Sequence, residues 1–340
     1  MPTQLLDAVS LASPSNASHD SLHCNRTLSF AHCIVGRPRT FVNRCVQQSI
    51  VTNVLKAMPG TSTSFLCLRL PSNATKWNEK ADYSLSSELD VRNAAERFRL
   101  MTNVAAVQIE GDEPVPAELR ADILRDDELA HLFQMWRNIQ GCFNLVLRHE
   151  RAVGQKFSFI TRLRPDAVFF DRWALPPFSC HLRSMLIPKG GLGCNTCSND
   201  HLALLPRDMS SRYFHDIFED YARCENGTCS RIHREGYKQH LSKLSRWVQF
   251  PQGNAGYVYH AVGLDFVTSH IPYALTSKRP GHVGLECRRL LMYSDLQHSV
   301  PYERQVPDPR DAAVNAAIRE SSPTVKSMLH RCTKWNCSDI

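Results

Sequence analysis

The sequence lacks the features that mark several large classes of protein. It has no run of 18 or more apolar residues, so it contains no candidate membrane span. It also has no tract of five basic residues, and its formal charge of +7 is modest for 340 residues, which argues against a nucleic-acid partner. The first 20 residues have neither a basic start nor an adequate apolar segment, so they do not resemble a signal peptide.

Several common site motifs are missing as well. The sequence contains no G-x-S-x-G, no H-E-x-x-H, no P-loop and no G-x-G-x-x-G. These absences argue against the common α/β-hydrolase, zinc-protease, NTPase and dinucleotide-binding classes. No internal repeat is visible either.

What is present is the composition of a globular protein, with 43% hydrophobic and 21% charged residues. The first residues are rich in Ser, Asn and Ala, whereas the last 40 are polar with helical patterning. We therefore expect a flexible segment over 1–28, one α/β domain over 29–300 and a helical, cysteine-bearing tail over 301–340.

The cysteine content is high, at 13 residues. Close pairs occur at Cys194 and Cys197, Cys224 and Cys229, and Cys332 and Cys337. Glycosylation sequons occur at Asn16, Asn25, Asn73, Asn226 and Asn336. Together they favour the oxidising secretory pathway or Golgi lumen, with disulfides pairing most thiols and 223–232 forming a disulfide-closed loop. The alternatives are a cytoplasmic protein with chance sequons and, for Cys194-x-x-Cys197, a zinc site.

Hydrophobic patterning predicts alternating strands and helices. Strands are expected at 30–36, 65–70, 104–109, from Phe157 towards Pro165, and at 185–188, with another apolar run at 202–205. Helices are expected at 42–58, from 126 to about Gly154, and from a cap at Asp208 to 221, whereas 71–95 is expected to be a polar surface excursion. This order predicts an α/β protein of three layers, with a mostly parallel sheet flanked by helices.

The stretch from Phe157 to Trp173 carries an unusual charge pattern. Arg162, Arg164 and Asp166 alternate along it, so on an extended chain they point to one side. Because Pro165 cannot donate to a sheet ladder, the strand should end there. Two cations and a carboxylate at the end of a strand suit a phosphate group or a metal ion.

A second polar cluster follows the first predicted strand. Arg37 and Arg39 lie in that turn, and guanidinium groups bind phosphate through two parallel hydrogen bonds. In open α/β sheets, ligands bind outside the carboxyl ends of the strands, where both this cluster and Asp166 would lie. We therefore predict a shared site, although solvated loop arginines would give the same pattern.

Asp166 is the best candidate for a metal or nucleotide ligand, with Asp171 as a second carboxylate unless Phe169 and Phe170 form a strand that carries it away. The competing interpretation is a surface ion pair between Asp166 and one of the arginines before it. A third cluster, Asn199-Asp200-His201, offers a general base or a sugar ligand, or else a simple cap.

Five segments of the chain are VGRPRTF, FLCLRL, WRNIQGCFNLVLRHERAVGQKFSFITRLRPDAVF, IPKG and CSNDHLALL. Together they resemble poorly characterised glycosyltransferase-like proteins with a GT-A-type fold, over about residues 30–280. Related sequences tend to read Y-D-x-V-I-R-x-R-x-D, then I-P, then N-D-Q-F-A. Arg164 and Asp166 match the first pattern, and Asn199 and Asp200 match the last. The resemblance implies a Rossmann-like nucleotide-binding core.

It also implies transfer of a hexosyl or pentosyl group from a nucleotide sugar to a hydroxyl of a glycan or glycoprotein. Asp166 would hold Mn²⁺ or Mg²⁺ and the diphosphate, and Asp200 would be the base or a sugar ligand. The donor-binding residues would be Arg37, Arg39, Arg162, Arg164 and Asn199. Since residue 164 is Arg, the regular D-x-D is absent, so the arginines can offset the diphosphate charge instead. The alternative from another class is a catalytically inactive glycan-binding or scaffold protein. A sulfotransferase fits less well, because no phosphate loop with Lys is seen.

Overall fold

The computed structural model describes residues 27–38, 40–70, 87–111, 127–169, 171–173, 175, 183–188, 201–222, 224–225, 228–229, 262–264, 266–269 and 273–275. Apart from residues 27 and 28, the segment expected at 1–28 lies outside these residues, as do the segment expected at 301–340, Cys194 and Cys197.

A seven-stranded, mostly parallel sheet forms the centre of the described fold, with the strand order β10-β6-β7-β4-β1-β2-β3. Its strands are β1 (Ser29–Gly36), β2 (Thr61–Leu70), β3 (Val104–Gly111), β4 (Phe159–Leu163), β6 (Met185–Pro188), β7 (Leu202–Pro206) and β10 (Phe266–Ser269). β1 runs parallel to β2 and β4, β2 to β3, and β6 to β10, whereas β7 is antiparallel to both of its neighbours. The predicted sheet type is confirmed.

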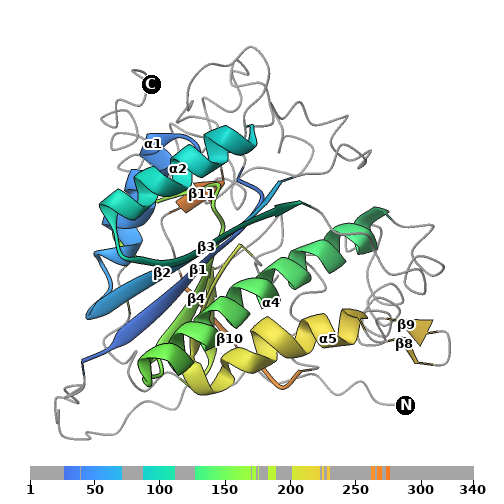
Figure 1. The fold of residues 1–340 in the computed structure, drawn as a ribbon. Coiled ribbons are helices and arrows are strands. Elements are labelled where there is room, and N and C mark those ends of the chain that lie inside the picture. Colours follow the sequence, from blue (N-terminus) through green and yellow to red (C-terminus); the bar gives the residue numbers. More distant parts are fainter. Residues whose placement is uncertain are drawn as a thin grey trace, which may run out of the picture.

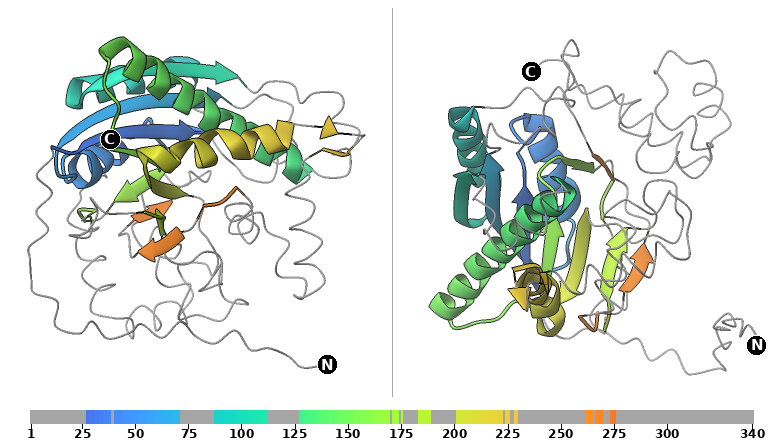
Figure 2. Two further views of the ribbon diagram at one scale, coloured as in Figure 1. Left: turned by 90° about the horizontal axis from the view of Figure 1, so that it is seen from below. Right: turned by 90° about the vertical axis from the view of Figure 1, so that its right-hand side faces the viewer.

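Helices cover both faces of this sheet and make the three predicted layers (Figure 1). One face carries α1 (Arg44–Ile50), its π-helical continuation η1 (Val51–Leu55) and α2 (Glu88–Met101). The other carries α4 (Asp127–Val153), followed by the π-helical turn η5 (Arg212–Asp216) and α5 (Ile217–Ala222). The two further views show α2 and α4 on opposite sides of the strands (Figure 2).

Alternation along the strands sorts side chains into two cores. In β1, Phe30 and Ile34 pack in the cluster under α1 and α2, whereas Cys33 and Val35 pack in the cluster under α4. Nearly continuous apolar strands are expected when both faces of a parallel sheet are covered. The place of a residue in the alternating pattern therefore decides which of the two cores its side chain joins.

The long helix α4 confirms the prediction for 126–154. Its inner stripe is buried and comprises Phe133, Trp136, Ile139, Phe143 and Val146. The helix ends at Val153, and Gly154 follows with φ of +69°, a left-handed conformation that glycine adopts without strain. Near this end, Glu150 is buried and accepts two hydrogen bonds from Arg207, at 2.7 and 2.6 Å.

The prediction of a polar surface excursion is wrong for Glu88 to 95, which belong to α2. The helix starts with a capping box, in which Ser87 and Asp90 exchange hydrogen bonds. Its buried face consists of Val91, Ala94, Ala95 and Phe98. Two alanines in this short stripe make the apolar signal weak, so the helical periodicity is hard to detect from the sequence.

Other differences are local. Asp208 does not cap a helix through its side chain but lies in a 3₁₀ turn, η4 (Arg207–Met209), and the chain to Ala222 is divided into three helical segments. After Asp166, β5 (Ala167–Phe169) forms a separate small sheet with β11 (Tyr273–Leu275). β8 (Cys224–Glu225) and β9 (Thr228–Cys229) form a hairpin.

The order of the strands has one topological switch that matters for the site. The chain builds β1, β2 and β3 outward in one direction and then returns to place β4 on the other side of β1. A crevice opens where strand order reverses, at the carboxyl ends of the two strands concerned. That point is the edge where β1 and β4 end.

Within the described residues, no helix has the length and apolar character needed to cross a bilayer.

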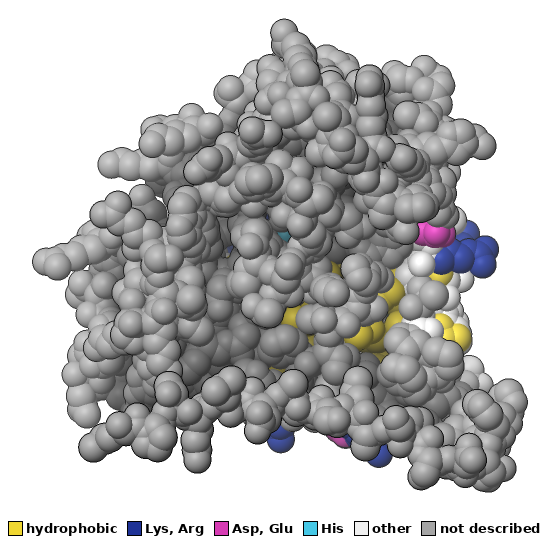
Figure 3. Space-filling view, turned by 180° about the vertical axis from the view of Figure 1, so that it is seen from behind, with side chains coloured by type: hydrophobic (Ala, Val, Ile, Leu, Met, Phe, Trp, Pro, Cys, Tyr) yellow, Lys and Arg dark blue, Asp and Glu magenta, His cyan; other side chains and the backbone are white. Residues whose placement is uncertain are grey.

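From behind, the described surface in view is mainly hydrophobic, with charged side chains mostly at its margins (Figure 3).

Candidate functional site at the β1–β4 switch point

A cavity of about 70 Å³ lies at the carboxyl ends of β1, β2 and β4, against the N-terminal half of α4. It is lined by Val35, Gly36, Arg37, Arg69, Gln134, Met135, Asn138, Ile139, Arg162, Arg164, Pro165 and Asp166. Pockets for whole small ligands usually measure about 300–1,000 Å³. The cavity is smaller than these pockets and has a size suited to a small charged group.

Strand alternation explains why two of the arginines reach this cavity. In β2, Phe65 and Cys67 face α4, and Arg69 continues this row to the end of the strand. In β4, Ile160 faces α4, and Arg162 follows it by two residues. Both arginines are buried, with 4% and 2% of their surface exposed.

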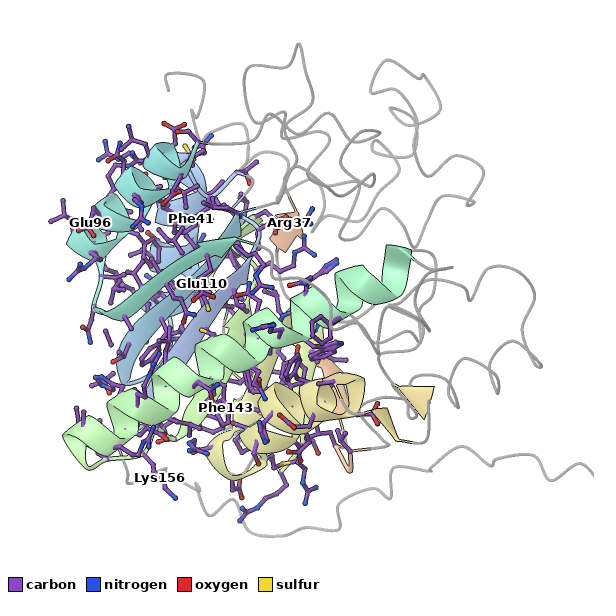
Figure 4. The ribbon with its side chains drawn as sticks, turned by 45° about the vertical axis from the view of Figure 1, so that its right-hand side comes forward. Arg37, Phe41, Glu96, Glu110, Phe143 and Lys156 are labelled. Atoms are coloured by element: carbon purple, nitrogen blue, oxygen red, sulfur yellow. The ribbon has the colours of Figure 1, made fainter. Side chains whose placement is uncertain are left out.

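Gly36 shapes the end of β1 beside the cavity. Its φ of +139° is a conformation that side-chain-bearing residues rarely adopt, and a Cβ there would lie 3.3 Å from Cδ of Pro165. The close approach brings the end of β1 onto the turn that follows β4. Arg37 comes next in the chain, and Figure 4 shows it at the end of the sheet opposite Lys156.

Arg164 and Asp166 form a bidentate ion pair just after the carboxyl end of β4. Nε of Arg164 donates to Oδ1 of Asp166 at 2.9 Å, and its Nη2 donates to Oδ2 at 2.8 Å. The Asp166 side chain is 1% exposed, and that of Arg164 is 21% exposed. The predicted competing interpretation, an ion pair, is thus present, although its carboxylate is buried rather than on the surface.

Two further contacts orient the buried arginines. Nη1 of Arg162 donates to the hydroxyl of Tyr213 at 3.3 Å, and the Tyr213 ring packs edge-on against Trp136, with centroids 5.4 Å apart. Nη1 of Arg69 donates to the side-chain oxygen of Gln134 on α4. The guanidinium groups are therefore held in place by residues of α4 and η5.

The chain beyond Asp166 is tied to α1 and η1. Phe169 donates its N–H to Oγ of Ser49 at 3.2 Å and accepts from Nδ2 of Asn53 at 2.7 Å. The N–H of Trp173 donates to the carbonyl of Asn53, also at 2.7 Å. This path takes Asp171 away from the cavity, which it does not line.

Four of the predicted site residues therefore meet, namely Arg37, Arg162, Arg164 and Asp166. The other three, Arg39, Asn199 and Asp200, lie outside the described residues. Sequence reasoning missed Arg69, Asn138 and Tyr213. Arg69 had a usable signal, because it is the one charged residue near the end of an otherwise apolar predicted strand; the other two depend on helix packing.

Four guanidinium groups and one carboxylate suit an anion better than a metal ion. Guanidinium binds phosphate oxygens in pairs and keeps its charge when buried. Both oxygens of Asp166 already accept from Arg164. The described residues contain no group of three or more His, Cys, Asp or Glu placed to hold a metal. With both of its oxygens engaged by Arg164, the Asp166 carboxylate does not fit the Mn²⁺ or Mg²⁺ that the resemblance implies there.

No family model matches the chain, and no curated protein matches it. Similar solved structures include a nucleoside-diphosphate-sugar pyrophosphorylase from Vibrio cholerae RC9, with a TM-score of 0.32 and 10% identity, covering 73% of this chain and 95% of that one. Another is the glycosyltransferase GlyE of Streptococcus pneumoniae TIGR4, with a TM-score of 0.30 and 7% identity, covering 72% of this chain and 46% of that one.

A third is a putative nucleotide-diphospho-sugar transferase from Desulfovibrio desulfuricans G20, with a TM-score of 0.31 and 8% identity, covering 90% of this chain and 99% of that one. These three neighbours are thus named as a pyrophosphorylase, a glycosyltransferase and a putative transferase.

Proposed function

We propose that this chain binds the diphosphate of a nucleotide sugar in the arginine-lined cavity and transfers the sugar to a hydroxyl of a glycan or glycoprotein. The observation that carries the proposal is the convergence of Arg37, Arg69, Arg162 and Arg164 at the β1–β4 switch point. Ligands of open α/β sheets bind at that position, and arginine is the residue best suited to paired phosphate contacts.

The arginines have separate roles in this proposal. Buried Arg69 and Arg162, held by Gln134 and Tyr213, bind the inner phosphoryl group. Arg164 is more exposed and binds the outer one, next to the sugar. Stabilising negative charge on the leaving diphosphate is the main way these groups assist transfer.

Asp200 remains the proposed general base or sugar ligand, with Asn199 beside it. In the β4–β7 ladder, Leu202 pairs with Leu163, the last residue of β4. Asp200 precedes Leu202 by two residues, a reach of at most about 7 Å. We propose that Asp200 acts on the sugar joined to the bound diphosphate.

The second candidate is a catalytically inactive glycan-binding or scaffold protein. It is favoured by one observation: Asp166, the one carboxylate among the cavity residues described, is engaged by Arg164. If Asp200 does not act as a base, the site binds without catalysing transfer. This candidate predicts nucleotide-sugar binding that is absent or unproductive.

The test is a binding and turnover screen. UDP- and GDP-sugars are titrated calorimetrically, and ligands that bind are then assayed for release of UDP or GDP with glycan acceptors. We expect binding that Arg69→Ala and Arg162→Ala each weaken at least tenfold, whereas the exposed control Arg92→Ala leaves it unchanged. Failure of every nucleotide and nucleotide sugar to bind would remove the proposal, and binding without turnover would favour the second candidate.

We further propose that the protein works in the secretory pathway, as the sequons and cysteines suggest. The hairpin ladder pairs Cys224 with Cys229 in register, and Cys45 is disulfide-bonded. By contrast, Cys33, Cys67 and Cys142 are free and buried. Alkylation of the unfolded, unreduced protein followed by peptide mass spectrometry should label these three but not Cys224 or Cys229; labelled Cys224 and Cys229 would count against the proposal.

A further inference from the structure

The pairing of Arg164 with Asp166 has a consequence for how an anion is held. We propose that the cavity binds the diphosphate without a divalent cation, and that Asp166 is a positioning residue that orients Arg164. The inference rests on the proposed function for the identity of the ligand. It concerns the means of charge neutralisation, which can be tested separately.

The local backbone builds the pair into the fold. The N–H of Ala167 donates to the carbonyl of Arg164 at 3.3 Å, which closes a turn with Pro165 at its second position. Proline fixes its own φ and suits that position. The turn therefore presents the side chains of Arg164 and Asp166 together, and Gly36 leaves so little space beside Pro165 that an added Cβ would lie 3.3 Å from its ring.

The bidentate geometry uses the faces of Asp166 that a metal would need. Each carboxylate oxygen accepts one N–H of the same guanidinium, at 2.9 and 2.8 Å. A divalent ion at this carboxylate would have to displace Arg164 or lie beside its positive charge. Like charges at such distances repel strongly, and more so in a site shielded from water.

The remaining charges in the cavity also oppose binding of a divalent cation. Arg37, Arg69 and Arg162 line the same hollow, so among the described residues an incoming cation would meet four guanidinium groups and one carboxylate already paired with Arg164. A diphosphate meets the opposite situation, because each guanidinium can donate two parallel hydrogen bonds to its oxygens. Arginine thus takes the role that a carboxylate-bound metal would otherwise have.

The first experiment needs only the wild-type protein. Binding of UDP and of inorganic pyrophosphate is measured by calorimetry in EDTA and again in Mn²⁺ and in Mg²⁺. We expect dissociation constants in EDTA that agree with those in either metal within about threefold, a difference smaller than 1 kcal/mol. Binding that appears only with a metal, or tightens tenfold or more with it, would overturn the inference.

The second experiment separates a positioning role from a metal-binding role. Asp166→Asn, assayed in EDTA, should weaken UDP binding about tenfold, because the amide holds Arg164 less firmly. Asp171→Asn is the matched control, since this carboxylate lies five residues further on and does not line the cavity. Unchanged affinity of Asp166→Asn in EDTA would contradict the positioning role. Thermal melts establish whether both variants fold. If Asp166→Asn does not fold, the comparison of wild-type binding in EDTA and in metal decides whether the cavity needs a cation.

The outcomes distinguish this inference from the proposed function. Nucleotide sugars that bind only with Mn²⁺ would support the proposed function and refute metal-free binding. A second outcome is that pyrophosphate binds in EDTA but no nucleotide or nucleotide sugar binds. This outcome would support metal-free binding and refute the proposed function. Absence of binding under every condition refutes both.

Discussion

Gly36 and Pro165 lie next to each other at the ends of β1 and β4, where a Cβ added to Gly36 would lie 3.3 Å from Cδ of the proline ring. The two residues are far apart in sequence, yet together they set the spacing at the switch point. Gly36 also adopts a φ of +139°, which an alanine would tolerate poorly.

The first prediction concerns this contact. Gly36→Ala should lower the free energy of unfolding by about 1–3 kcal/mol, because of the strained φ, and should also weaken UDP binding by displacing the Pro165 turn. Denaturant unfolding and calorimetry measure the two effects.

Gly154→Ala is the matched control. Gly154 also has a positive φ, of +69°, but a Cβ added there would meet no atom within 4 Å. This variant should lose about 1–2 kcal/mol of stability and keep its UDP affinity. Equal affinities in both variants would show that Gly36 does not shape the site.

The second prediction concerns Tyr213, whose hydroxyl accepts from Arg162. Tyr213→Phe keeps the ring contact with Trp136 and removes one hydrogen bond. We expect a loss of about 1 kcal/mol, seen as roughly fivefold weaker UDP binding. An affinity for UDP equal to that of the wild type would show that the hydrogen bond from Arg162 to Tyr213 does not contribute to binding.

The third prediction concerns the pair of Glu150 and Arg207, which links the end of α4 to the chain after β7. The N–H of Phe157 also donates to Glu150, at 3.0 Å. Burial alone would raise the pKa of Glu150, but the hydrogen bonds from Arg207 and Phe157 outweigh it and lower that pKa. This stabilisation is present above the ordinary pKa of a glutamate and is lost as pH falls through the lowered one.

Glu150→Gln should therefore cost about 1.5–3 kcal/mol at neutral pH, measured by denaturant unfolding. The control is Glu88→Gln, which breaks an exposed i, i+4 pair with Arg92 at 2.5 Å. Exposed pairs of this kind contribute about 0.3–0.5 kcal/mol. Similar losses in the two variants would mean that burial of Glu150 adds nothing.

The fourth prediction is a pH effect of His32, a fully buried residue in β1. Ser62 donates its hydroxyl proton to the carbonyl of Leu55 at 2.8 Å, so it accepts from Nε2–H of His32 at 3.0 Å. Nδ1 then accepts from the hydroxyl of Thr161 at 2.8 Å. The imidazole is thus neutral, and burial lowers its pKa to about 3.

Because the unfolded chain takes up this proton near pH 6.5 and the folded chain does so only near pH 3, stability should fall as pH is lowered between these values. The slope contributed by His32 is about 1.4 kcal/mol per pH unit. Denaturant unfolding at pH 7, 6 and 5 measures it. His32→Gln should flatten the curve in this window; an unchanged slope would show that other groups cause it.

The sequence by itself determined much of the framework. The βαβ pattern, the apolar stripe of α4 and its end at Gly154 are local signals, and they predicted the sheet type and layers correctly. The alternation of Arg162, Arg164 and Asp166 predicted a charged strand end, because side-chain direction in an extended chain follows from its period of two.

Only the tertiary structure decided how these charges are used. The register of β1, β2 and β4 adds Arg69 to the cluster, and packing of α4 and η5 brings Gln134 and Tyr213 to the arginines. The turn at Pro165 joins Arg164 to Asp166, which the sequence pattern had made a candidate for either a metal or a nucleotide ligand. Local pattern sets the direction in which a side chain points, but its partner depends on contacts between residues far apart in the chain.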